Sequence, residues 1–263
     1  MKFNVNRVQE GLRARRFGRR LIFLREVGST NDLAKELASY GAVEGTVVVA
    51  ETQRAGRGRL GRTWFSPAGG LYFSVVLRPN VRAGAAVTLV FVASLAMVKV
   101  LRELYGLRVE TKWPNDVLVN GKKVCGILAE MKITGEIVKF VVVGIGVNAN
   151  VNVEEAFPEE LRSSVTSLEN KFRKKVELEV LFRALLEKLE SVYELFVKEG
   201  FASVLKEWKK YASFVGCRVE VTSGTEKWVG LALDVESDGS LVMRLEDGTV
   251  KHVFVGDISL RQK

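Results

Sequence analysis

The segment Gln53–Trp64 concentrates more chemistry than any other part of the chain. From Arg54 to Arg62 it places four arginines and three glycines in nine residues. Arginine is a permanently charged, forked donor that suits carboxylate and phosphate, and glycine lets backbone N–H groups approach a ligand closely. Like charges repel and glycine loses much entropy on ordering, so a bound anion would offset the cost of closing such a loop. This arginine loop therefore predicts closure over a small anionic ligand.

Three nucleotide-binding motifs overlap the arginine loop, and the surrounding residues argue against each of them. Its glycines have the spacing of the dinucleotide fingerprint and nearly that of a P-loop. Both motifs need a helix directly after the glycines, whereas Trp64–Gly70 has the composition of a turn. A kinase glycine loop requires a catalytic-loop histidine, and the one histidine is the distant His252. On the residues alone, a solvated basic loop is the remaining alternative.

Other polar segments stand at the ends of predicted strands or in turns, namely Ser29–Asn31, Lys112–Asp116 and Gly144–Asn150. Polar groups converging from separate strands predict a small-molecule pocket. Fixed positive charge would come from Arg57, Arg59, Arg62 and Lys112. Such charge suits the positioning of phosphates and the stabilisation of charge in their reactions. Neither a His/Cys metal-ligand pattern nor a Ser-His-Asp set is present in the sequence.

Hydrophobic periodicity indicates the elements that must position these residues. A helix begins at Ser29, with Asp32 as its capping-box partner, and ends at Gly41. A buried helix covers Ala85–Leu104, since its uncharged stretch is short for a membrane span. Two more helices lie between residues 176 and 212. Strands are expected at Leu21–Val27, Thr46–Ala50, Leu71–Leu77, Val109–Lys112, Asp116–Val119, Val124–Met131 and Ile137–Val143.

The composition changes near residue 213. Short alternating strands follow at Phe214–Val221, Trp228–Val235, Leu241–Leu245 and Val250–Val255, with Asp-Gly pairs that favour hairpin turns. We therefore predict two domains. Residues 1–212 form an α+β domain with a mixed, mainly antiparallel sheet and packed helices, and residues 213–263 form a small β-barrel or sandwich.

Bulk composition narrows the class of protein further. The chain has 263 residues, is 47% hydrophobic, and contains two cysteines, Cys125 and Cys217. Two cysteines make no disulfide framework and no signal peptide is visible, so we expect a reduced, cytoplasmic protein with no membrane role. Residues 1–25 hold eight of the 40 Lys/Arg but one of the 31 Asp/Glu. This basic arm is either a solvated or docking segment or a weak, nonspecific nucleic-acid contact.

Several segments, taken in order, resemble the biotin protein ligase family, and the resemblance spans roughly residues 8–262. The joining of the arginine loop to the Lys-Trp-Pro-Asn-Asp motif is its most specific part. The matching segments are Ser29–Asn31, Gln53 with Gly56–Arg62 and Trp64, Ser66–Pro67, Gly69–Leu71, Lys112–Asp116, Gly126–Leu128 with Glu130, Gly144–Gly146 with Asn148, Thr166–Leu168 and Gly256–Arg261.

The resemblance implies a class II synthetase-like, biotin/lipoate ligase catalytic domain and an SH3-like C-terminal barrel. It implies that ATP and biotin are substrates, that Mg²⁺ accompanies the triphosphate on ligands that the sequence does not identify, and that biotinyl-5'-AMP is the intermediate. The biotin would pass to a lysine of a biotin carboxyl carrier domain. The family likeness also implies a homodimer formed through edge strands of the main sheet.

The resemblance also implies roles for individual residues. Lys112 and Arg57 would be catalytic. The biotin site would consist of Ser29, Thr30, Asn31, Gln53, Gly56, Arg57, Gly58, Arg59, Lys112 and Gly126. ATP and the adenylate would be held by Arg57, Arg59, Arg62, Trp64, Lys112, Asn115 and Asn148.

The chain differs from some members of the family at its N-terminus, and two other functions compete with the ligase assignment. Some family members carry an N-terminal DNA-binding domain of about 60 residues, but here about 28 residues precede Ser29, so we predict a short form without operator binding. The first rival is a lipoate ligase or octanoyltransferase of the same superfamily, against which the arginine loop argues. The second is a nucleic-acid-binding module, which needs aromatic residues interleaved with basic ones. The C-terminal segment mixes acidic and basic residues instead.

Overall fold

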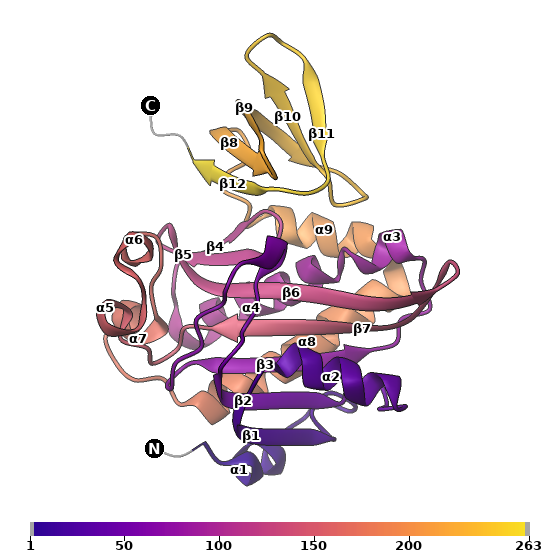
Figure 1. Ribbon diagram of the computed structural model, residues 1–263, viewed down its shortest axis with the longest axis vertical. Helices are drawn as coiled ribbons and strands as arrows, with labels where there is room; N and C mark the ends of the chain where they lie inside the picture. Colours follow the sequence, from indigo (N-terminus) through magenta and orange to yellow (C-terminus); the bar gives the residue numbers. More distant parts are fainter. Residues whose placement is uncertain (1–2, 261–263) are drawn as a thin grey trace.

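The computed structural model describes residues 3–260. A seven-stranded sheet with the order β1-β2-β3-β7-β6-β5-β4 forms the main body (Figure 1). Its first two strands pair in parallel and the others antiparallel, which confirms the expected mixed, mainly antiparallel α+β architecture. The strands are β1 (Leu21–Val27), β2 (Val47–Gln53), β3 (Leu71–Leu77), β4 (Val109–Lys112), β5 (Asp116–Val119), β6 (Lys122–Thr134) and β7 (Ile137–Val147).

Alternation along the central strands gives the sheet two apolar faces. Val47 and Val49 of β2 face the larger core, whereas Val48 between them faces a smaller one, because successive strand side chains point to opposite faces. Helices α4 (Leu89–Tyr105), α8 (Leu178–Glu199) and α9 (Phe201–Lys209) cover the larger core, and α2 (Thr30–Ser39) covers the smaller. The short helices α5 (Val153–Ala156), α6 (Glu159–Arg162) and α7 (Leu168–Phe172) lie at one end of the sheet.

The long apolar helix expected at Ala85–Leu104 is divided in two. A short helix α3 (Ala83–Ala86) precedes α4, and Val87 and Thr88 separate them. The run Ala83–Tyr105 is long and apolar enough to cross a membrane by composition, but 72% of its most apolar stretch is buried inside the protein. The expectation of a buried core helix is therefore met by α4.

The basic arm is packed on the protein rather than free in solvent. Helix α1 (Val5–Glu10) lies against α8, and Val8 and Phe17 are fully buried. The backbone N–H groups of residues 15–17 donate to the carboxylate of Glu190, at 2.6, 2.7 and 3.2 Å. The described backbone of the arm is therefore docked on the protein, whereas a nucleic-acid contact of its exposed arginine side chains stays untested.

A second, five-stranded antiparallel sheet follows α9, as expected for the small C-terminal β-domain. Its order is β11-β10-β9-β8-β12. The last strand, β12, was not predicted as a separate element. The strands are β8 (Arg218–Ser223), β9 (Glu226–Val235), β10 (Leu241–Leu245), β11 (Val250–Val253) and β12 (Asp257–Leu260). The apolar side chains of this sheet join the main core, and Trp113 Nε1 donates to Gly239 O at 2.8 Å across the junction.

Candidate active site

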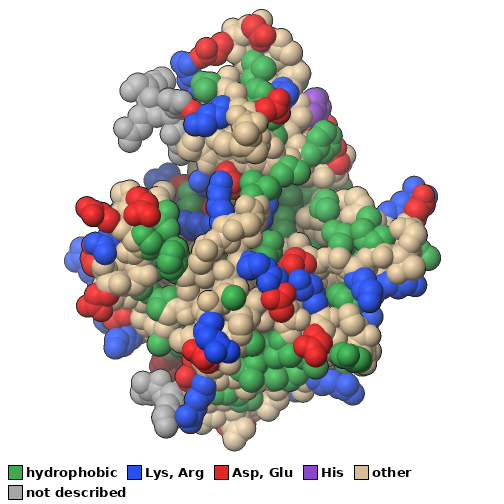
Figure 2. All heavy atoms as spheres, in the orientation of Figure 1, with side chains coloured by type: hydrophobic (Ala, Val, Ile, Leu, Met, Phe, Trp, Pro, Cys, Tyr) green, Lys and Arg blue, Asp and Glu red, His purple; other side chains and the backbone are tan. Residues whose placement is uncertain are grey.

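A cavity of about 350 Å³ opens beside the arginine loop. Figure 2 shows Lys and Arg side chains around the hollow where the C-terminal sheet meets the main body. Twelve predicted site residues line this cavity, namely Ser29, Thr30, Asn31, Gln53, Arg57, Gly58, Arg59, Arg62, Trp64, Lys112, Asn115 and Gly126. The fold thus brings together residues from strand ends and turns that lie far apart in the sequence. Gly56 and Asn148 do not line it.

The start of α2 supplies a fully connected polar wall. Gln53 Oε1 accepts from the backbone N and the hydroxyl of Thr30, at 2.8 and 3.0 Å. The Ser74 hydroxyl donates to Asn31 Oδ1 at 2.6 Å. A Cβ on Gly144 would overlap the Asn31 amide, so the glycine allows this approach of α2 to β7. The wall offers amide and hydroxyl groups to a polar, uncharged part of a ligand.

The capping box expected at the start of α2 is not formed. Ser29 occupies the N-cap position, but its side chain makes no capping hydrogen bond. The Asp32 carboxylate turns instead to the arginine loop, where a charged guanidinium offers a stronger partner than a backbone N–H group. This prediction was wrong because a tertiary ion pair replaced a local hydrogen bond.

The arginine loop folds back on itself as a tight hairpin. Gly58 N donates to Arg62 O at 2.7 Å and Trp64 N donates to Gly56 O at 2.9 Å. A Cβ on Gly56 would overlap the Trp64 carbonyl and approach Ser66 Oγ to 2.8 Å. Gly56 is therefore buried inside the hairpin and shapes it, although the resemblance placed it in the biotin site.

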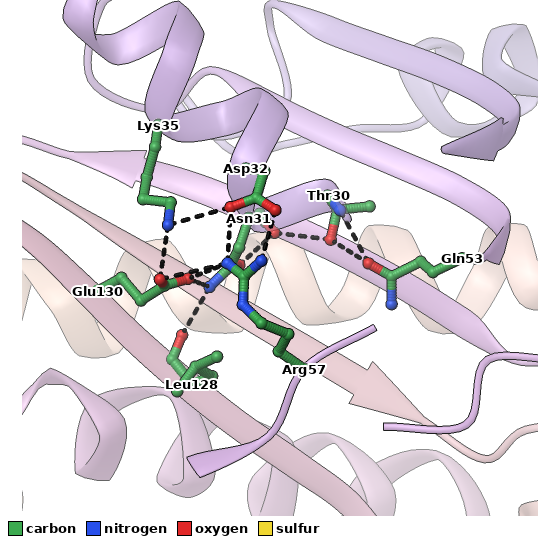
Figure 3. Close-up of polar contacts among 9 residues, drawn as sticks. Thr30, Asn31, Asp32, Lys35, Gln53, Arg57, Leu128 and Glu130 are labelled. Atoms are coloured by element: carbon green, nitrogen blue, oxygen red, sulfur yellow. Dashed lines mark hydrogen bonds and ion pairs between the residues drawn. The ribbon is translucent and has the colours of Figure 1, made fainter. Parts of the chain in front are cut away.

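Arg57 lines the cavity and reaches from the loop to two acidic side chains, Asp32 and Glu130, which do not themselves line it. Its Nη1 and Nη2 donate to Asp32 at 2.5 and 2.6 Å, and Nη2 also lies 3.2 Å from Glu130 Oε2. Lys35 Nζ lies 3.1 Å from Asp32 Oδ1 and 2.6 Å from Glu130 Oε1. Figure 3 shows these four charged side chains converging around Asn31. The guanidinium holds the pKa of Asp32 down at about 2.

Arg59 and Arg62 join the loop to the second sheet. Arg59 Nη1 donates to Asn115 Oδ1 at 3.2 Å and to Gly256 O at 3.1 Å. Arg62 Nη1 lies 2.7 Å from Asp257 Oδ2. Asp257 also lines the cavity, so the C-terminal domain contributes a carboxylate to the site.

Lys112 ends β4 at the cavity, beside a cis Trp113–Pro114 peptide bond. Burial lowers the pKa of its ammonium, and the positive charge of Lys123 lowers it further, while Asp116 opposes the change. None of the described residues forms an ion pair with Lys112, whereas Asp116 pairs with Lys123 Nζ at 2.7 Å. A half-buried cation without a close counter-ion is suited to an anionic ligand.

Trp64 lies flat against two glycines of neighbouring strands. A Cβ on Gly126 would stand 2.7 Å from its Cζ3, and one on Gly146 would overlap its Nε1. The Lys123 ammonium lies 5.3 Å from the centre of the ring, within the range of a cation–π contact. Asn148 follows β7 and is fully buried. Its Nδ2 donates to Thr166 O at 3.2 Å, and its Oδ1 has no hydrogen-bond partner. Gly126 and Gly146 thus provide a flat seat for the indole.

The sequence-based prediction missed several polar side chains of the site. Asp32 and Lys35 are three residues apart on α2 and therefore share a face, and Glu130 follows Leu128 on the same face of β6. These periodicities could have revealed them. No local pattern places Asp257, because its position depends on how the second sheet packs. The residues left without an individual site role are Asp32, Lys35, Asp116, Lys123, Glu130 and Asp257. Asp116, Glu130 and Asp257 nevertheless stand in segments that carry the family resemblance.

Comparison with known proteins agrees with the site over most of the chain. Residues 23–148 match the Biotin/lipoate A/B protein ligase family, and residues 214–261 match the Biotin protein ligase C terminal domain. The chain is 34% identical over 260 residues to the Bifunctional ligase/repressor BirA of Bacillus subtilis, covering 98% of this chain and 79% of that protein. It is 35% identical over 223 residues to the Biotin--[acetyl-CoA-carboxylase] ligase of Paracoccus denitrificans, covering 84% of this chain and 92% of that protein.

Solved structures agree with the sequence comparison. A biotin protein ligase from Aquifex aeolicus in complex with biotin and ATP superposes with a TM-score of 0.77 at 30% identity, covering 93% of this chain and 100% of that one. The C-terminal match belongs to biotin protein ligases by its description, whereas the catalytic match includes the lipoate enzymes. The chain therefore belongs to the biotin protein ligase family.

Proposed function

We propose that the protein attaches biotin to an acceptor lysine in two steps that consume ATP. The observation that carries this proposal is the closed arginine loop over a cavity that joins a polar amide wall to the half-buried Lys112, which has no ion-pair partner among the described residues. Biotin has a polar ureido ring at one end and a carboxylate at the other. The Thr30–Asn31 wall suits the first, and the cations suit the second and the phosphates of ATP.

The first step forms biotinyl-5'-AMP. A carboxylate oxygen of biotin attacks the α-phosphorus of ATP, the bond from that phosphorus to the bridging oxygen of the β-phosphate breaks, and pyrophosphate leaves. Two anions must approach each other, so the barrier falls when a fixed cation lies between them. Lys112 is the residue to which we assign this role.

The second step transfers the biotinyl group. The neutral amine of the acceptor lysine attacks the carbonyl carbon of the mixed anhydride, the bond from that carbon to the phosphate oxygen breaks, and AMP leaves. The nitrogen loses a proton as the amide forms. A closed arginine loop would protect the anhydride from water until the acceptor arrives.

We assign the adenine ring of the adenylate to a position beside the Trp64 indole. The indole offers a stacking face. The adenine contact that the resemblance implies for Asn148 stays a prediction, because its unpartnered Oδ1 is buried and Asn148 does not line the cavity. Arg59, Arg62 and Asn115 lie where the phosphates would follow. These assignments place both ends of the intermediate on side chains that the fold already holds.

Mg²⁺ is proposed to enter with the triphosphate. In the described part of the chain no group of three or more His, Cys, Asp or Glu side chains could hold a metal ion. Mg²⁺ commonly takes phosphate oxygens and waters with few protein ligands, so this site fits a metal carried by ATP. Bound Mg²⁺ would screen the phosphate charge. Removal of divalent cations with EDTA should abolish pyrophosphate release, and full activity in EDTA would contradict this part of the proposal.

The acceptor is proposed to be a biotin carboxyl carrier domain, in the cytoplasm. We also propose a homodimer and a division into domains at 1–212 and 213–263. Sedimentation at a mass of 29.2 kDa under all protein concentrations would argue against the dimer.

The decisive measurement is pyrophosphate release from ATP and Mg²⁺ with biotin, with lipoate, and with neither. Release that depends on biotin supports the proposed function. Release with lipoate would move the protein to the lipoate branch, which the C-terminal match disfavours. A carrier domain added to the biotin reaction should then gain one biotin and release AMP.

A further inference from the structure

We propose that Asp32 and Glu130 form a catch that holds Arg57, and with it the arginine loop, over the cavity before any substrate binds. The catch then keeps biotinyl-5'-AMP in the site until the acceptor arrives. Its second part rests on the proposed function, whereas its first part concerns the free protein. Asp32 and Glu130 are positioning residues in this proposal, since they act through Arg57.

The geometry of the catch is that of a forked cation between two carboxylates. Arg57 gives both of its terminal nitrogens to Asp32, at 2.5 and 2.6 Å, and shares Nη2 with the two Glu130 oxygens at 3.2 and 3.3 Å. Paired parallel hydrogen bonds of this kind are stronger and more directional than a single contact. The terminal donors of Arg57 thus point to carboxylates of α2 and β6, which ties the loop to both elements.

The two carboxylates belong to elements that do not move with the loop. Asp32 stands in the first turn of α2, which packs on the sheet, and Glu130 stands in the middle of β6, paired with β7. Glu130 is also fixed by Lys35 at 2.6 Å and by Asn31 Nδ2 at 2.7 Å. Arg57 is thus held between a helix and a strand that both belong to the main body (Figure 3).

The same contacts connect the catch to the ligand wall. Asn31 Nδ2 donates to Glu130, and Asn31 Oδ1 accepts from Ser74 on the side of the wall that carries Thr30. A ligand that orders this wall would also order Glu130. Closure of the loop and occupation of the biotin end of the cavity are therefore linked through one amide.

The charges of the catch persist near neutral pH, and the catch can still open. The pKa of Asp32 is about 2 because of Arg57, so its carboxylate stays ionised well below pH 7. The side chains of Arg57 and Asp32 are 37% and 51% exposed, so water and salt reach them and weaken the pair. High ionic strength should therefore weaken the ion pair between Arg57 and Asp32 and loosen the loop.

The chain contains a matched control at the beginning of the same loop. Arg54 pairs with Glu26 at 3.4 Å, and both side chains are largely exposed. Neither residue lines the cavity. Glu26→Gln therefore removes a Glu–Arg pair from the loop without touching the proposed catch.

The first experiment follows tryptic cleavage of the ligand-free protein in the arginine loop, in the wild type, Asp32→Asn, Glu130→Gln and Glu26→Gln. Cleavage in the native state reports how often the loop opens. We expect about tenfold faster cleavage in Asp32→Asn, a smaller increase in Glu130→Gln and none in Glu26→Gln. Salt should raise the wild-type rate and leave that of Asp32→Asn unchanged. Equal cleavage of the wild type and Asp32→Asn would overturn the catch.

The second experiment measures dissociation of preformed biotinyl-5'-AMP in Asp32→Asn, Arg57→Ala and the double variant. Two residues that act through one contact should not have additive effects on release. Asp32→Asn alone should therefore speed release of biotinyl-5'-AMP about tenfold. Added to a protein that already carries Arg57→Ala, it should change the release rate little. Additive effects would refute the catch. If the wild type released no pyrophosphate with biotin, the proposed function would fail, while the cleavage experiment would still decide the closure of the free loop.

Discussion

Lys112 is the residue on which the proposed chemistry depends most. It is a half-buried cation at the cavity and has no ion-pair partner among the described residues. Lys112→Met should lower the rate of pyrophosphate release by roughly 100- to 1,000-fold, as expected for loss of one charge stabiliser, with an unchanged circular dichroism spectrum. Lys112→Arg keeps the charge and should retain more activity. Single-turnover kinetics with saturating biotin and ATP measures this.

The pH dependence of the same step follows from burial. The pKa of Lys112 lies below its ordinary value of 10.5 because the ammonium is desolvated. The charge is present below that lowered pKa and disappears as the pH rises through it, so the rate should fall on the alkaline side. The alkaline fall should be absent in Lys112→Arg. An identical fall in both proteins would assign it to another group.

Gly146 is the second residue at which a substitution should have a specific effect on ATP kinetics. A Cβ there would overlap the Trp64 indole nitrogen, and overpacking of this kind costs about 1–3 kcal/mol or displaces the side chain. Gly146→Ala should raise the KM for ATP and change biotin affinity little. Gly84→Ala is the control, because nothing lies within 4 Å of its added Cβ. Normal ATP kinetics in Gly146→Ala would remove Trp64 from the nucleotide site.

At the scale of elements, the sequence predicted what depends on local pattern. Strand β3 was placed correctly over Leu71–Leu77, because an apolar run bounded by turn residues indicates a buried strand. The break between α3 and α4 was missed, since Val87 and Thr88 carry no strong stop signal. Strand β12 was missed too, because Asp257–Leu260 is four residues long and is defined by its pairing with β8.

The same limit applies to the site. Motif residues such as Gln53 and Lys112 were found in the sequence, and the fold brings them to one cavity. Asp32 was interpreted as a local cap, but long-range attraction to Arg57 determined its position. Asp257 reaches the site from the other end of the chain. Local pattern therefore identified the groups that line the cavity better than the groups that hold them in place.

Docking of the N-terminal arm is an element-scale feature with its own test. Glu190 is 5% exposed and accepts three backbone N–H groups of the arm. Removing that acceptor leaves buried donors unsatisfied, so Glu190→Ala should lower the free energy of unfolding by about 1–3 kcal/mol in urea. Glu187→Ala removes a single, exposed bond to Arg13 N and should cost less. Equal losses would mean that the arm contributes little through Glu190.

At the scale of the whole molecule, the second sheet contributes side-chain and backbone contacts to the candidate site. Asp257 approaches both Arg59, at 3.7 Å, and Arg62, at 2.7 Å, and Gly256 O accepts from Arg59 at 3.1 Å. Three contacts thus join the arginine loop to β12 and to Gly256, the residue before it. Orientation of these arginines then depends on the C-terminal sheet, whose core is continuous with the main one.

Asp257→Asn tests this dependence without removing a domain. The amide keeps the shape of the side chain but loses the charge that holds Arg62 and Arg59, so the arginines should be less ordered toward the phosphates. We expect the KM for ATP to rise about tenfold, which corresponds to about 1.4 kcal/mol, with biotin affinity and the urea midpoint nearly unchanged. Glu246→Gln is the control, because Glu246 pairs with Arg218 in the same sheet and lies outside the cavity. If Asp257→Asn and Glu246→Gln both behave like the wild type, the second sheet does not act on the arginine loop through this carboxylate, and its packing against the main core is what connects the two parts.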